Sequence, residues 1–291
     1  ETAAAVLVDG VLRSNVVAGQ EVHAQWGGVV PELASRAHQE HIVPVVEAAL
    51  RDAAINRNDL SAIAFTQGPG LIGALLVGTC FARSMAQALK IPLLGVDHMQ
   101  AHILAHFIRD GSERSVPEFP FLNLTVSGGH TLLVLVKSPL DMEVLGTTLD
   151  DAAGEAFDKG AKVLGLPYPG GPLVDKHARG GDPRKYTLPM PQIAGADMSF
   201  SGVKTAFNNL VQRGLQTDPE FRTKELAHLC ASLQQSIVDI LLRKVHRTAR
   251  RTGVGHVAMS GGVSANSALR AHFQAMAERE GWQAHVPPLA Y

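Results

Sequence analysis

The two halves of the sequence repeat one order of elements: a short apolar strand, a loop with glycine, a helix and a second strand. In the first half this order runs from a strand at 63–66 to a strand at 93–96. In the second half it runs from a strand at 256–259 to a strand at 282–286. Strands joined through a helix usually lie parallel in one sheet. The repeat therefore predicts an α/β protein with a duplicated, two-lobe fold.

The lobes separate at a polar segment, so we expect an N-terminal α/β lobe over 1–112 and a C-terminal α/β lobe over 117–291. The second lobe is expected to carry a helical insertion at about 172–252, which includes one long basic and apolar helix at about 219–251. Two strands open the first half, and Asp9-Gly10 between them predicts a two-residue hairpin. Three strands open the second half, and no helix follows the last strand. We therefore expect one further strand before Glu1 and one further helix after Tyr291, so that the fold is truncated at both ends.

Charge is balanced, with 26 Lys+Arg against 27 Asp+Glu and a formal net charge of −1. Nucleic-acid-binding proteins usually carry a basic excess, so contact with RNA would need a local patch or a partner. Two basic groups are candidates for such a patch, and each is equally compatible with a solvated surface. They are Arg243, Lys244, Arg247, Arg250 and Arg251, and Lys176, Arg179, Arg184 and Lys185.

Cys80 and Cys230 are the only cysteines, which is a poor basis for a disulfide framework and favours a reducing cytoplasm. No apolar stretch of about 18 residues is free of charges or turn signals, so we expect no membrane span.

Glycines cluster at four places near expected strand ends: 128–129, 154, 170–171 and 261–262. Backbone N–H groups in such loops can bind phosphate oxygens without a lysine. Open α/β sheets bind ligands at the carboxyl ends of their strands. The alternative for any single pair is that the glycines only close a turn, but four sites in matching places favour a ligand site between the lobes.

A helix expected at about 97–108 places His98 and His102 one turn apart on one face, and His106 continues that face. Two histidines at this spacing can share one metal ion, and a third ligand must come from elsewhere. Met99 stands where a metalloprotease needs a glutamate base, which argues against peptide hydrolysis. A histidine pair without a metal is the alternative.

Asp150 and Asp151 begin the next helical segment, as acids in its first turn. Asp151, Glu155 and Asp158 share one face of it. Such carboxylates can accept from a ribose hydroxyl or hold a metal; the alternative is capping of the helix. A further helix begins at 199–204, with a serine as its expected cap and Lys204 available to an anionic substrate.

These motifs together resemble one family, the universal tRNA threonylcarbamoyladenosine transferases, TsaD in bacteria, once labelled O-sialoglycoprotein endopeptidases. The matching runs are spread in order over nearly the whole chain: 27–36, 68–71, 98–102, 126–130, 150–159, 168–172, 199–204 and 260–266. The resemblance implies the actin/Hsp70/sugar-kinase fold. It also implies transfer of the threonylcarbamoyl group from threonylcarbamoyl-adenylate, an ATP-derived substrate, to the adenosine beside the anticodon of tRNAs that read codons starting with A.

The resemblance also implies site residues and partners. His98 and His102 would bind one divalent metal ion, iron or alternatively zinc, and a third ligand, an Asp, would lie beyond Tyr291. Partners would be tRNA, a shorter TsaB-like paralogue on the N-terminal lobe and a small TsaE-like P-loop ATPase. The adenylate would lie against Thr125, Val126, Ser127, Gly128, Gly129, Asp158, Gly171, Asp175 and Asn266.

Two other functions stay open. One is a kinase or carbamoyltransferase of the same fold that acts on a small molecule without tRNA. The other is a non-catalytic scaffold that only holds a paralogue.

Overall fold

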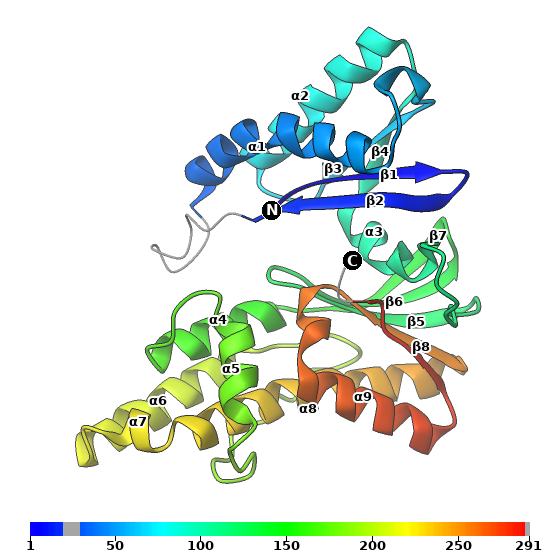
Figure 1. Cartoon of the computed structure of the whole chain (residues 1–291). Helices are drawn as coiled ribbons and strands as arrows, with labels where there is room; N and C mark the ends of the chain where they lie inside the picture. The colour runs from blue at the N-terminus through cyan, green and yellow to red at the C-terminus, as the bar shows by residue number, and fades with distance from the viewer. Residues whose placement is uncertain (20–29, 289–291) are drawn as a thin grey trace. The chain divides into compact units, whose positions relative to one another are not determined.

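The computed structural model describes residues 1–19 and 30–288. The chain forms two compact units, Glu1–Arg114 and Ser115–Tyr291 (Figure 1). The Gly27-Gly28 pair at the start of the 27–36 motif lies outside the described residues.

Unit 1 opens with a β-hairpin whose turn residues explain its geometry. Strands β1 (Thr2–Val8) and β2 (Val11–Ala18) pair antiparallel. Asp9 and Gly10 have φ values of 52° and 74°. Positive φ at both central positions matches the twist of a two-residue hairpin, and Asp-Gly tolerates it. The hairpin expected here is confirmed.

The remainder of unit 1 is a parallel strand–helix–strand unit with additional helices. Strand β3 pairs parallel with β4, and α2 connects them. The helix expected at about 97–108 is shorter than expected, because α3 ends at Leu104 and a 3₁₀ turn follows it. The elements are α1 (Pro31–Asp52), η2 (Arg57–Asp59), β3 (Ile63–Gly68), α2 (Ile72–Leu89), β4 (Leu93–Asp97), α3 (His98–Leu104) and η3 (Ala105–Phe107).

Unit 2 is built on one sheet in the order β7-β6-β5-β8-β9. Its central strand β5 is buried at every position, pairing antiparallel with β6 and parallel with β8. Strands β8 and β9 are also parallel and are connected through α9, as β3 and β4 are through α2. The internal repeat is thus confirmed. The strands are β5 (Phe121–Val126), β6 (Thr131–Ser138), β7 (Asp141–Thr147), β8 (His256–Ser260) and β9 (Gln283–His285).

The helices of unit 2 gather on one side of this sheet (Figure 1). Helix α8 supplies much of the core, with residues such as Leu229, Leu233 and Ile237 fully buried. The single helix expected near 219–251 is divided, since α7 ends before Glu225 and α8 begins after it. The helices are α4 (Ala153–Val163), α5 (Gly170–Ala178), α6 (Ser201–Thr217), α7 (Phe221–Lys224), α8 (Leu226–Thr252), η4 (Gly262–Ala265) and α9 (Ser267–Glu280).

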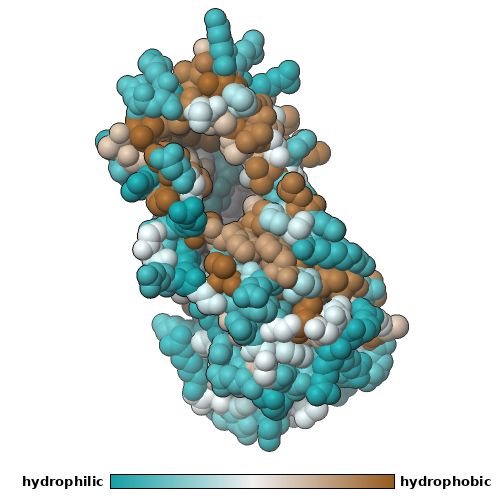
Figure 2. Space-filling model, turned by 90° about the vertical axis from the view of Figure 1, so that its right-hand side faces the viewer, coloured by the Kyte–Doolittle hydropathy of each residue, from teal (hydrophilic) through white to brown (hydrophobic). Residues whose placement is uncertain are grey.

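Helix α2 has an unusually exposed apolar surface. By length and composition alone it could cross a membrane, a test that core helices of many proteins also pass. Its buried residues are Ala82 and Ala86, whereas Ile72 is 76% and Leu76 55% exposed. Figure 2 shows hydrophobic residues over much of the visible surface of unit 1, while the lower part of unit 2 is mainly hydrophilic. An exposed apolar face of this kind points to an interaction surface.

Candidate functional site

Glycine loops meet at the carboxyl ends of β5 and β8, the parallel pair at the centre of unit 2. Gly261 follows β8 with a φ of 87°, and a Cβ atom there would collide with the backbone carbonyl of Val126. A Cβ atom at Gly154 would lie 2.6 Å from the carbonyl oxygen of Ser127. Only glycine allows these backbones to approach so closely. The loops expected to form a ligand site are therefore in direct contact.

The loop after β5 is held as a tight turn. The Ser127 N–H donates to the His130 carbonyl (2.9 Å), and the His130 N–H donates to Ser127 Oγ (3.1 Å). Thr125 and Val126 are buried beneath this turn, whereas Gly128 and Gly129 are exposed. A hydrogen bond from Asn123 Nδ2 to Thr125 Oγ1 (2.9 Å) helps fix the end of the strand. The exposed glycine backbone has the character of an anion-binding turn.

Asp158 connects this loop to the next motif. It lies one helical turn after Gly154 on α4, so the two share a helix face. Its Oδ1 atom accepts from the backbone N–H groups of Gly170 (2.8 Å) and Gly171 (3.1 Å). Asp158 thereby satisfies two of the unpaired N–H groups at the start of α5 and positions the glycine pair.

Asp175, on α5, and Asn266, the N-cap residue of α9, are neighbours in the structure. Asp175 Oδ1 accepts from the hydroxyl of Ser267 (2.6 Å) and its N–H (3.2 Å). Asn266 caps α9 by accepting from the Leu269 N–H (2.9 Å) and donates to Gln234 Oε1 on α8 (2.6 Å). All nine candidate adenylate residues thus lie within unit 2, where these hydrogen bonds connect Asp158 to Gly171 and Asp175 to the residue after Asn266. The supporting role of Gln234 was not visible in the sequence.

The acidic segment before α4 does not present the expected shared face. Helix α4 begins at Ala153, so Asp151 precedes it. The Asp151 carboxylate pairs with Lys159 and, at 2.8 Å, with Lys204; Glu155 also pairs with Lys159 at 3.0 Å. Partial burial opposes ionisation of Asp151, but the two lysines outweigh it and lower its pKa. Asp151, Glu155, Lys159 and Lys204 thus form one network of ion pairs.

Asp150 does perform the expected capping, but on a different helix. Partial burial opposes its ionisation, yet its pKa is lowered because it accepts from the hydroxyls of Ser199 and Ser201, each at 2.6 Å, and from backbone N–H groups there. Position 199 was expected to cap its own helix. Instead α6 has no side-chain cap from its N-cap residue, and Asp150 supplies the acceptor.

The histidine pair lies at the start of α3 in unit 1. Asp97 caps this helix by accepting from the N–H groups of Met99 and Gln100, both at 2.9 Å. The rings of His98 and His102 are half-buried and their centroids are 4.4 Å apart. Adjacent rings on consecutive turns are compatible with two imidazole ligands to one metal ion. Within the described residues, no group of three or more His, Cys, Asp or Glu side chains is placed to hold a metal. His106 is buried in the 3₁₀ turn, away from the helical register expected for it.

These features define a class of protein before any particular family. Duplicated α/β units with glycine loops at the ends of parallel strands form the fold of the actin, Hsp70 and sugar-kinase class. Two solved structures of HypF share the fold. The chain superposes on the T. kodakarensis protein with a TM-score of 0.59 at 16% identity, covering 85% of this chain and 40% of that one. A nucleotide-bound HypF gives a TM-score of 0.56 at 11% identity, covering 86% and 46%.

The chain belongs to the TsaD family of tRNA N6-adenosine threonylcarbamoyltransferases, whose family model matches residues 10–291. A relative of that name from Christiangramia forsetii is 55% identical over the whole chain, which covers 85% of the relative. Another, from Cytophaga hutchinsonii, is 53% identical over the whole chain, which covers 84% of it. The family resemblance seen in the motifs is confirmed.

Proposed function

We infer that the chain transfers a threonylcarbamoyl group from threonylcarbamoyl-adenylate to the exocyclic amine of the adenosine beside the anticodon, in tRNAs that read codons starting with A. The observation that carries this inference is the match to a transferase family of that name over residues 10–291. The contacts that join the glycine loops in unit 2 support it, because an adenylate needs donors for its phosphate and its ribose.

The adenylate binds along the nine-residue assembly of unit 2. Its phosphate faces the exposed backbone of Gly128 and Gly129, where amide dipoles favour an anion. Asp158 holds Gly171 in place, and Asp175 and Asn266 position the last side of the site through Ser267 and Gln234. Donors fixed in advance stabilise the adenylate as it leaves, since they do not reorganise during the reaction.

A divalent metal ion, iron or alternatively zinc, is held in part by His98 and His102. When bound, such an ion supplies Lewis-acid polarisation of a carbonyl group. The role of the chain is to orient the two imidazoles, and the Asp97 cap does so by fixing the first turn of α3.

The transfer needs no covalent intermediate on the protein. The adenosine amine attacks the carbamoyl carbon, a new C–N bond forms, the bond from that carbon to the phosphate oxygen breaks, and AMP leaves as the amine loses a proton. The cysteines do not suit nucleophilic catalysis. Burial raises the pKa of Cys230 to about 12, which keeps it a thiol, and Cys80 lies in unit 1.

Partners and location follow from the same proposal. The exposed apolar residues at the start of α2, Leu71, Ile72 and Leu76, offer unit 1 a surface for a shorter TsaB-like paralogue. A small TsaE-like P-loop ATPase completes the set. Both cysteines are free, which is in keeping with a reducing cytoplasm.

The test is transfer of labelled threonine to tRNA by the full-length protein with its companion enzymes, together with metal analysis. We expect His98→Ala and His102→Ala each to lower bound metal and labelling at least tenfold. Gln100→Ala, an exposed change on the same helix, is the control and leaves both unchanged.

Each alternative predicts a different result. A wild-type protein that never labels tRNA but transfers a phosphoryl or carbamoyl group to a small molecule would identify the kinase or carbamoyltransferase alternative. Full labelling by both histidine variants would support the scaffold alternative, with catalysis residing in a partner.

A further inference from the structure

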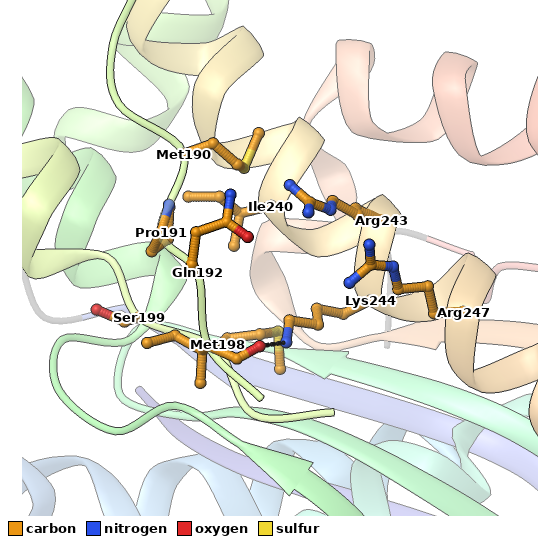
Figure 3. A pocket seen from close by; sticks show the side chains of 10 residues that line it. Met190, Pro191, Gln192, Met198, Ser199, Ile240, Arg243, Lys244 and Arg247 are labelled. Atoms are coloured by element: carbon orange, nitrogen blue, oxygen red, sulfur yellow. Dashed lines mark hydrogen bonds between the residues drawn. The ribbon is translucent and has the colours of Figure 1, made fainter. Parts of the chain in front are cut away.

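A basic pocket lies between α8 and the segment that precedes α6, and the proposed chemistry does not use it (Figure 3). It is a small hollow, lined on one side by Arg243, Lys244 and Arg247. The opposite side includes Gln192 and Ser199. In Figure 3 the two arginine side chains extend from α8 toward the segment that carries Gln192.

Lys244 is buried and gives the pocket a charge that no carboxylate neutralises directly. Its Nζ atom donates to the backbone carbonyls of Ile193 (2.7 Å) and Gly195 (2.9 Å). Burial lowers the pKa of Lys244, the neighbouring Arg247 and Arg243 lower it further, and Asp197 partly opposes them. Three cations are therefore crowded together, which is unfavourable unless an anion joins them.

Arg243 and Arg247 differ from several of the basic residues singled out in the sequence, which form ion pairs. Among the residues that the structure describes, neither has a carboxylate within ion-pairing distance, although Arg243 is half-buried. By contrast, Arg250 pairs with Glu280 at 2.9 Å. In the second basic group, Arg179 pairs with Asp175 (3.7 Å) and Lys185 pairs with Glu225 (2.6 Å). The pocket therefore brings three basic side chains together without a carboxylate among its lining residues, in a chain of net charge −1.

We propose that this pocket binds a backbone phosphate of the tRNA substrate through Arg243 and Arg247. The proposal rests on the proposed function, which supplies the RNA. Guanidinium groups bind phosphate oxygens through paired hydrogen bonds, and the arginines lie one helical turn apart, facing one opening. A near-neutral protein that acts on tRNA needs such a local patch, because its overall charge provides no attraction. Lys244 acts as a fixed positive charge behind them.

The test measures tRNA binding against salt concentration for the full-length protein with its companion proteins. The variant is Arg243→Gln/Arg247→Gln, which removes both charges and keeps polar side chains. The slope of log K against log [salt] scales with the number of phosphates neutralised, so loss of this one phosphate contact in the double variant should reduce the slope by roughly 0.7 to 0.9. We expect affinity at low salt to fall by roughly 10-fold or more, with AMP binding unchanged.

Two controls make the result specific. Arg250→Gln removes the same charge from the same helix, but this arginine is already paired, so the slope should stay at the wild-type value. Arg243→Lys/Arg247→Lys keeps the charges and should retain most of the slope while losing part of the affinity. The thermal unfolding midpoint of each variant is measured to show that it is folded.

The proposal would be overturned if Arg243→Gln/Arg247→Gln kept the wild-type slope and affinity for tRNA. It would also be overturned if this variant lost binding to a companion protein but still bound tRNA normally. Equal slopes for the Gln and Lys double variants would also overturn it. The proposed function fails separately, if the wild-type protein does not label tRNA.

Discussion

Gly154 is the position where the contact between the loop after β5 and α4 can be tested most directly. A Cβ atom there would lie 2.6 Å from the Ser127 carbonyl oxygen and 2.7 Å from Gly128 Cα. Both are backbone atoms, so Gly154→Ala must move the loop by about 0.5 to 1 Å to restore van der Waals contact. We expect overpacking to cost roughly 1 to 3 kcal/mol, offset by up to about 1 kcal/mol because alanine favours the helix.

The larger effect of Gly154→Ala should be on function. A displacement of about 1 Å in a positioned group can lower a rate by roughly 100-fold, so we expect transfer to tRNA to fall by about 10- to 100-fold. Binding of AMP should weaken in parallel. Stability is measured by urea unfolding, AMP binding by calorimetry, and transfer by labelled threonine.

Gly160 provides the matched control in the same helix. Alanine there would meet a methyl group of Leu233 in the core, away from the loop. Gly160→Ala should therefore cost stability with little effect on AMP binding. If Gly154→Ala bound AMP and labelled tRNA like the wild type, the loop would not be part of the site, and this reasoning would be refuted.

Two other predictions follow from particular contacts. Asp150→Asn weakens the acceptor at the start of α6 and should cost about 1 kcal/mol at neutral pH. The folded-state pKa of Asp150 lies below its ordinary value of 3.8, so its contribution is complete above that pH and is lost as the pH falls through the folded pKa. Urea unfolding of the two proteins should therefore converge in acid; a constant difference down to pH 2 would contradict the assignment. Phe207→Ala removes a fully buried ring of α6 and should lower the free energy of unfolding by roughly 3 to 5 kcal/mol, as measured by urea unfolding. A loss below about 1 kcal/mol would show that the core repacks to fill the cavity.

The sequence predicted an element well where one or two neighbouring residues determine its conformation. Asp9-Gly10 can form only a few kinds of turn, and the hairpin follows from their φ values. Pro31 stands at the first position of α1, where its missing N–H costs nothing. Boundaries were less predictable. The division of one long helix at Glu225, and the early end of α3 at Leu104, depend on packing that the periodicity of the chain does not contain.

The roles of the acidic residues show where sequence reasoning reached its limit. Asp150 and Asp151 have the composition of a helix start, and both were assigned to α4. Asp150 instead binds Ser199, 49 residues later, and Asp151 binds Lys204, 53 residues later. A carboxylate accepts hydrogen bonds from whichever donors lie near it in the folded protein, and their positions along the chain do not identify them in advance.

By itself, the sequence determined the α/β class, the internal repeat, the family and the identity of the glycine loops, because periodicity and short motifs are local properties. The tertiary structure alone decided which charges are neutralised and which stay unpaired. The acids at 150–151 are fully engaged, while Arg243 and Arg247 share a pocket without a carboxylate. Electrostatic energy depends on distance and burial in space, and both arise only when the chain is packed.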